Sequence, residues 1–208
     1  AKAYTGFANN GRSSEPYYIS RIEDGKGNLL VEFKPKTQNK AAYSETTREI
    51  MIEIMKATVN EGTATRLRST YGLQNDIAGK TGTTQSNKDG WFVGLTPELL
   101  AVTWVGADDH RIGFRNTSIG QGANSALPIF ALFLQKINDD PDFATISSAR
   151  FCNPSAEVVS LMDSEISEKD GFFYKLFGNY DKKRDRKNDD KKKKCLFNNL
   201  FVKKTKDK

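Results

Sequence analysis

Three short strand-like segments joined by compact turns constrain this chain more than any other feature of its sequence. They span residues 76–84, 91–95 and 100–106, and they are rich in β-branched, aromatic and small residues. Segments of this length, bounded by polar and Gly- or Pro-containing stretches, are typical of β-strands. Thr96-Pro97-Glu98 favours a tight reversal between the last two segments. The sequence therefore predicts an antiparallel meander of three strands.

Helical patterns lie on both sides of these segments. Residues 44–61 have apolar side chains at spacings of three and four, Ser44 can cap the free amides at the start, and Gly62 can end the helix. Residues 125–137 predict a second amphipathic helix with Pro128 in its first turn. Residues 2–9 predict the end of a helix.

The other segments complete the predicted order. Residues 17–33 favour a hairpin around Asp24-Gly25-Lys26-Gly27. Residues 35–40, 62–73 and 108–124 are predicted to be connecting segments, and 151–162 a short extended one. A hairpin, a helix, three antiparallel strands and a helix indicate an α+β fold, an antiparallel sheet with helices packed on it.

The distribution of charge argues against a nucleic-acid-binding domain. The net charge is +6, but residues 182–208 alone carry thirteen Lys or Arg against four Asp, which is +9 and leaves −3 for the rest. We expect residues 182–208 to be a basic disordered tail after an extension at 139–181. Cys152 and Cys195 form neither a disulfide framework nor a metal-binding spacing. A bridge between the two stays open for an oxidising compartment, but the sequence favours two unpaired thiols.

The motif with chemical meaning is Gly-Lys-Thr-Gly-Thr-Thr at residues 79–84. Alone it is weak evidence, because a strand with a surface lysine and a bulge at Gly82 would look the same. Lys-Thr-Gly on a strand is, however, part of the signature of serine β-lactamases and penicillin-binding proteins. Further matching segments occur in the right order at residues 7–11, 24–27, 62–64, 89–97, 102–109 and 126–130. Residues 1–138 thus resemble the end of the transpeptidase domain of class A (bifunctional) penicillin-binding proteins.

This resemblance implies roles for five residues. Lys80 would supply positive charge in catalysis and substrate binding, and Thr81 and Thr83 would bind the substrate carboxylate through their hydroxyls. Gly82 would allow the substrate backbone to approach closely, and Thr84 would complete the binding strand. The backbone N–H of Thr83 would donate to the oxyanion. The resemblance implies no cofactor and no metal.

The nucleophilic serine of such a domain lies in Ser-x-x-Lys, with a Ser-x-Asn partner, and neither pattern occurs in the 208 residues. We therefore expect the N-terminal part of the domain, with its serine, to be missing, the isolated chain to be inactive, and the sheet to have one uncovered face. The implied partners are peptidoglycan stem peptides, β-lactam antibiotics and other cell-wall synthesis proteins, not nucleic acid. The implied location is the bacterial cell envelope, at the extracytoplasmic face of the inner membrane. The resemblance further implies that a membrane anchor and a glycosyltransferase domain lie upstream of this chain, and that the anchor provides its only attachment to the membrane.

Two other functions stay open at this point. A serine β-lactamase or carboxypeptidase has the same fold, and a non-catalytic binding domain would need no serine.

Other residues have simpler interpretations. Asp89 is interpreted as a turn residue or a brace beside Lys80, Arg66 and Arg68 as exposed residues able to face an anionic substrate, and His110 as a solvated loop residue. Trp91, Phe92 and Trp104 are predicted to lie in the core.

Overall fold

The computed structural model describes residues 1–109 and 111–167. The predicted tail at 182–208, Cys195 and His110 lie outside this range. Within it, no helix combines the length and the apolar character needed to cross a membrane.

The central sheet is the predicted meander. Strands β5 (Ala78–Thr83), β6 (Asp89–Leu95) and β7 (Leu100–Gly106) pair antiparallel in the order β5-β6-β7. The reversal between β6 and β7 is closed by a hydrogen bond from the Thr96 amide to the Leu99 carbonyl, at 2.8 Å. The strand prediction is confirmed within two residues at each end, and the fold is the expected mixture of helices and antiparallel sheet.

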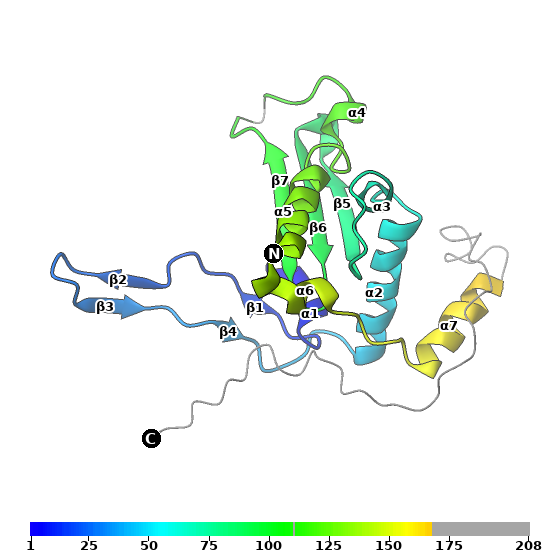
Figure 1. Ribbon diagram of the computed structural model, residues 1–208, viewed down its shortest axis with the longest axis horizontal. Helices are drawn as coiled ribbons and strands as arrows, with labels where there is room; N and C mark the ends of the chain where they lie inside the picture. Colours follow the sequence, from blue (N-terminus) through cyan, green and yellow to red (C-terminus); the bar gives the residue numbers. More distant parts are fainter. Residues whose placement is uncertain (110, 168–208) are drawn as a thin grey trace.

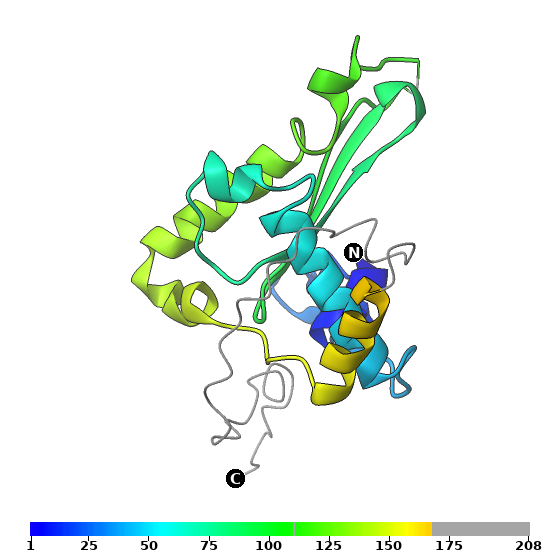
Figure 2. The same ribbon diagram turned by 90° about the vertical axis from the view of Figure 1, so that its right-hand side faces the viewer.

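Two long helices pack on the sheet (Figures 1 and 2). Helix α2 (Glu45–Asn60) starts where the sequence predicts, since the Ser44 hydroxyl accepts from the Thr47 amide at 3.1 Å. Helix α5 (Leu127–Asp139) has its proline in the first turn, as expected. Figure 2 shows α5 running along one side of the sheet, while near the α4 end the opposite side carries no helix of the described chain.

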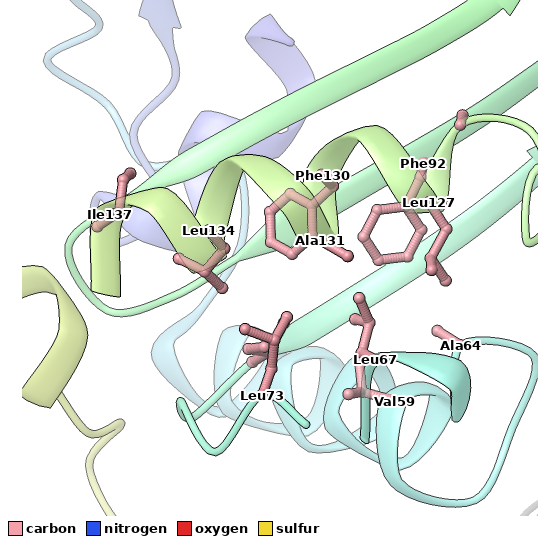
Figure 3. Packing of buried hydrophobic residues seen from close by; sticks show 12 residues of the cluster. Val59, Ala64, Leu67, Leu73, Phe92, Leu127, Phe130, Ala131, Leu134 and Ile137 are labelled. Carbon is pink, nitrogen blue, oxygen red and sulfur yellow. The ribbon is translucent and has the colours of Figure 1, made fainter. Parts of the chain in front are cut away.

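The main core lies between α5, the sheet and the segment that follows α2 (Figure 3). Phe92 of β6 stacks at a tilt on Phe130 of α5, with ring centroids 5.1 Å apart. Gly94 leaves room for this packing, because a Cβ there would lie 2.3 Å from the Phe130 ring. A second cluster joins Ile52 and Met55 of α2 to the base of the sheet.

The prediction that Trp91 and Trp104 are core residues is wrong. Both are about two-fifths exposed, at 41% and 42%, whereas Phe92 is fully buried. Successive side chains of a strand point to opposite faces of the sheet. Because Phe92 points toward α5, the next side chain along, Trp91, must point to the other face. Trp91 and Trp104 are cross-strand partners on the other face, with ring centroids 6.1 Å apart. Among the described residues, α2 covers this face at the base of the sheet, beside Ala78 and Leu95, and the two indole rings lie beyond that contact.

The N-terminal region consists of helix α1 (Lys2–Ala8) and a two-part arm. Strands β1 (Ser14–Glu15) and β4 (Lys36–Thr37) pair at its base, and β2 (Arg21–Glu23) and β3 (Leu29–Glu32) form the hairpin that projects from the domain (Figure 1). The hairpin is confirmed, but its first strand begins at Arg21 rather than at residue 17. The predicted connector at 35–40 contains β4.

Several predicted loops contain short helices. These are α3 (Arg66–Ser69) and α4 (Thr117–Gly120), and a 3-10 turn, η1 (Gln85–Asn87), joins β5 to β6. In the extension after α5, for which the sequence predicts no element before residue 151, lie the 3-10 turn η2 (Pro141–Phe143) and α6 (Ala144–Ser148). The Asn116 side chain starts α4 by accepting from the Ile119 amide at 3.1 Å. Such single turns carry too little periodicity to be seen in sequence.

The prediction of an extended segment at 151–162 is also wrong. Residues 156–167 form helix α7 (Ala156–Ser167), whose residue Val158 is completely buried. Contacts between α7 and α2 provide the packing that stabilises this helix, and the sequence does not show them. Cys152, just before α7, is disulfide-bonded, so the prediction of an unpaired thiol is wrong for this residue.

Replacing Phe130 tests the main core. Phe130→Ala removes a fully buried ring, and we expect it to lower the free energy of unfolding by about 3–5 kcal/mol in urea titrations followed by circular dichroism. Leu132→Ala on the same helix is the matched control, because Leu132 is 55% exposed and its loss should change stability by less than about 0.5 kcal/mol. Equal effects of the two substitutions would contradict this assignment of the core.

Candidate functional site

The Lys-Thr-Gly motif lies on strand β5, at an edge of the sheet. Among the described residues β5 pairs with β6 alone. The Thr84 amide donates to the Asp89 carbonyl at 3.1 Å, so the backbone groups of Thr84 face β6. Because these directions alternate along an antiparallel strand, the amides of Thr83 and Thr81 are directed toward the open edge. Among the described residues, no strand pairs with these two amides at the outer edge of β5.

The side chain of Lys80 lies on the face of the sheet that carries Trp91 and Trp104. Its register partner is Val93, next to Trp91 on the same face. Lys80 is exposed, and its Nζ donates to the Thr81 carbonyl at 2.6 Å. The ammonium group is therefore held close to the strand backbone while it remains open to solvent.

Thr81 and Thr83 direct their side chains to the helix-covered face, where each hydroxyl has a neighbour. The Thr81 hydroxyl lies 2.8 Å from that of Thr63, which follows α2. The Thr83 hydroxyl accepts from the Gly122 amide at 3.1 Å. Since that bond uses an acceptor site of the hydroxyl, its hydrogen stays available to donate to another group.

The segment at residues 121–125 closely approaches the motif. A Cβ at Gly122 would lie 2.2 Å from the Trp91 carbonyl oxygen and 2.5 Å from that of Gly82, so only glycine fits there. Arg66 fixes the segment from the other side by donating to the side-chain oxygen of Asn124 at 2.5 Å. Sequence analysis missed Gly122 and Asn124 because their contacts with β5 and α3 join parts of the chain about forty to sixty residues apart.

Asp89 braces the turn that follows the motif. Its carboxylate accepts from the Thr84 hydroxyl and from the Trp104 indole, both at 2.9 Å, and its amide donates to the Thr84 hydroxyl oxygen at 2.9 Å. Thr84, expected to bind substrate, therefore has its hydroxyl engaged in the turn.

Arg66 and Arg68 have structural contacts that their predicted exposure does not account for. Arg68 donates to the carbonyls of Leu73 and Asn75, at 2.6 and 2.8 Å, and desolvation by burial lowers the pKa of its guanidinium group. These contacts hold the segment that leads into β5. In the described ranges, no group of three His, Cys, Asp or Glu side chains is placed to hold a metal ion.

Comparison with known proteins agrees with this geometry. The sequence model of the family described as "Penicillin binding protein transpeptidase domain" matches residues 1–121, more than half of the chain. The chain belongs to the penicillin-binding protein transpeptidase domain family. The matched residues include all five motif positions from Lys80 to Thr84.

Curated penicillin-binding proteins are similar over part of the chain. Penicillin-binding protein 1A of Clostridium novyi is 42% identical over 105 residues, which are 50% of this chain and 12% of that protein. Penicillin-binding protein 1A of Neisseria lactamica is 36% identical over 138 residues, which are 65% of this chain and 17% of that protein. The chain thus spans less than a fifth of the length of these relatives.

A solved penicillin-binding protein structure has the same fold. Penicillin-binding protein 1A from Haemophilus influenzae superposes with a TM-score of 0.56 at 24% identity, covering 74% of this chain and 27% of that one. The α+β fold, predicted from the order of the elements, and its likeness to transpeptidase domains, predicted from the resemblance, are therefore confirmed.

Substituting Gly122 tests the close contact beside the motif. Gly122→Ala places a Cβ against two backbone oxygens, and we expect it to cost about 1–3 kcal/mol and to shift the NMR signal of the Thr83 amide. Gly25→Ala in the hairpin turn is the control, because a Cβ there meets nothing within 4 Å. A Gly122→Ala protein with unchanged stability and an unchanged Thr83 signal would refute the contact.

Proposed function

We propose that this chain is part of a peptidoglycan D,D-transpeptidase that crosslinks stem peptides through a serine acyl-enzyme, and that it forms the substrate-binding wall of the site. The observation that carries the proposal is the position of Lys-Thr-Gly on the open edge of β5, in a chain of the penicillin-binding protein family. We assign residues 1–138 to the transpeptidase domain, 139–181 to an extension and 182–208 to a basic tail.

The peptide would bind as an added strand along β5. The outward amides and carbonyls of Thr81 and Thr83 can pair with an extended backbone. Gly82 presents no side chain against it, and Lys80 lies beside this edge with its positive charge exposed. A terminal carboxylate of a D-Ala-D-Ala end would accept from the Thr81 and Thr83 hydroxyls and be attracted by Lys80.

The outward amide of Thr83 would be one oxyanion donor. A fixed N–H aimed at the developing negative charge stabilises the tetrahedral intermediate, and loss of one such donor costs about 3–4 kcal/mol in comparable sites. A β-lactam carbonyl would occupy the same position as the scissile peptide carbonyl, which accounts for the proposed binding of these antibiotics.

The nucleophile would come from polypeptide outside these 208 residues, since the sequence contains no Ser-x-x-Lys. The exposed Trp91 and Trp104 on the Lys80 side of the sheet offer an apolar surface against which that polypeptide would pack. Without it the chain would bind but would not form an acyl-enzyme. We place the complete protein at the bacterial cell envelope, facing the cell wall, with other cell-wall synthesis proteins as partners.

Labelling with a fluorescent penicillin tests the proposal. A protein that joins this chain to its upstream Ser-x-x-Lys segment should be labelled, and the isolated chain should not. Lys80→Ala in the joined protein should slow labelling by at least about tenfold, because it removes the charge beside the carboxylate. Lys26→Ala, in the exposed hairpin turn, is the control and should label at the original rate.

Two further observations distinguish the competing functions. In the gene sequence upstream of Ala1, an open reading frame that contains Ser-x-x-Lys supports an enzyme, whereas a start codon immediately before Ala1 supports a binding domain. The second observation is a hydrolysis assay on the joined protein. Rapid turnover of a chromogenic cephalosporin would indicate a β-lactamase instead. Absence of labelling in the joined protein would overturn the transpeptidase assignment.

A further inference from the structure

Residues 147–155 comprise the last two residues of α6 and the segment that joins α6 to α7, and they run across the base of the domain against α2 and the residues that lead into β5 (Figure 1). We call this segment the strap. The family match ends at residue 121, so the strap lies outside the part of the chain that defines the family. Two of its hydrogen bonds reach Asn75 and Asp76, which lie three and two residues before the motif strand.

Asn75 is the first point of attachment. Its side chain is 5% exposed, and its amide nitrogen donates to the Ser147 carbonyl of the strap at 3.1 Å. The same side chain makes two reciprocal hydrogen bonds, both at 2.9 Å, with the amide of Asn138 at the end of α5. Because a buried amide is costly to leave unpaired, these bonds fix the approach to β5.

Asp76 is the second point of attachment, and both of its carboxylate oxygens are used. One accepts from the Phe151 amide of the strap at 2.9 Å. The other lies 3.6 Å from the Nζ of Lys56 on α2, which also pairs with Glu53 at 3.0 Å. Asp76 therefore joins the strap to α2 at a position four residues before Lys80.

The Phe151 side chain anchors the strap in the second core cluster. It is 8% exposed and packs in that cluster with Met55 of α2 and with Ala78, the first residue of β5. Lys56 Nζ lies 5.8 Å from the centre of its ring. Farther along, the Ser155 amide donates to Glu49 of α2 at 2.9 Å. The strap thus connects α2 with the start of β5 by a buried ring and by hydrogen bonds.

We propose that the strap positions the Lys-Thr-Gly strand, with Phe151 and Asp76 as positioning residues. In the part of the chain that the structure describes, β5 is an edge strand, so pairing with β6 holds only one of its sides. The strap fixes its beginning independently of that pairing, so that the outward amide of Thr83 keeps one position. The effect on acylation rests on the function proposed above, whereas the effect on the strand does not.

Hydrogen exchange of the 208-residue chain tests the effect on the strand. By the register, the amides of Lys80 and Gly82 bond to β6, and those of Phe92 and Gly94 bond to β7. Phe151→Ala should speed exchange at Lys80 and Gly82 by about tenfold or more and leave Phe92 and Gly94 within about twofold. An equal acceleration at all four amides would mean a general loss of stability and would overturn the proposal, as would no acceleration at all.

Three further variants control the experiment. Phe143→Ala removes a ring of the same type that is 44% exposed just ahead of the strap, and it should leave all four amides unchanged. Asp76→Asn retains an acceptor for the Phe151 amide and should exchange almost as the original chain does, whereas Asp76→Ala should behave like Phe151→Ala. If the two Asp76 variants exchange alike, the hydrogen bond to Phe151 does not hold the strand. Phe151→Leu retains an apolar anchor and supplies a milder comparison if the alanine variant does not fold.

Penicillin acylation of the joined protein tests the consequence for the reaction. Phe151→Ala and Asp76→Ala should both lower the second-order rate constant of acylation. Asp76→Asn, which retains the acceptor for the Phe151 amide, should be acylated at nearly the original rate. Altered exchange with an unaltered acylation rate would overturn the positioning role in catalysis. If the unsubstituted joined protein is not acylated, the proposed function fails while the exchange result still decides the role of the strap.

Discussion

The packing of α5 against strand β6 is the contact on which the rest of the domain depends. Phe130 fits over Gly94 and beside Phe92, and this arrangement fixes which face of the sheet is apolar and covered. Thr103 of β7 adds a hydrogen bond to the Ala126 carbonyl at the start of α5, at 2.9 Å. Once this face is occupied, alternation along the strands forces Lys80, Trp91 and Trp104 onto the other face.

The motif strand pairs with β6 on one side and, among the described residues, with no strand on the other, so contacts from neighbouring segments help to hold it. On the helix-covered face, the hydroxyls of Thr81 and Thr83 meet Thr63 and the Gly122 amide. At the beginning of the strand, Asn75 and Asp76 receive contacts from Arg68, α2 and the strap. At its end, Asp89 closes the turn. Within the described ranges no second strand pairs with the outer edge of β5, toward which the amides of Thr81 and Thr83 are directed.

The sequence predicted the parts of the fold whose signals are local. The meander, the N-cap at Ser44, the proline in the first turn of α5 and the hairpin each depend on neighbouring residues, and all were placed within a few residues of their observed ends. Trp91, Trp104 and α7 were misjudged for the opposite reason. Their environments depend on which element covers a face, and apolar character alone does not tell a covered strand position from an uncovered one.

The sequence by itself determined that this chain carries Lys-Thr-Gly on a strand, that the strand belongs to an antiparallel meander, and that no Ser-x-x-Lys accompanies it. These features depend only on the identity of residues that are close together in the sequence. Only the tertiary structure decided that the strand is an edge strand among the described residues, that the Thr83 amide faces its open side, and that Gly122 and Phe151 reach the motif region from distant parts of the chain. These features arise from contacts between segments far apart in sequence, which follow from how the whole chain packs.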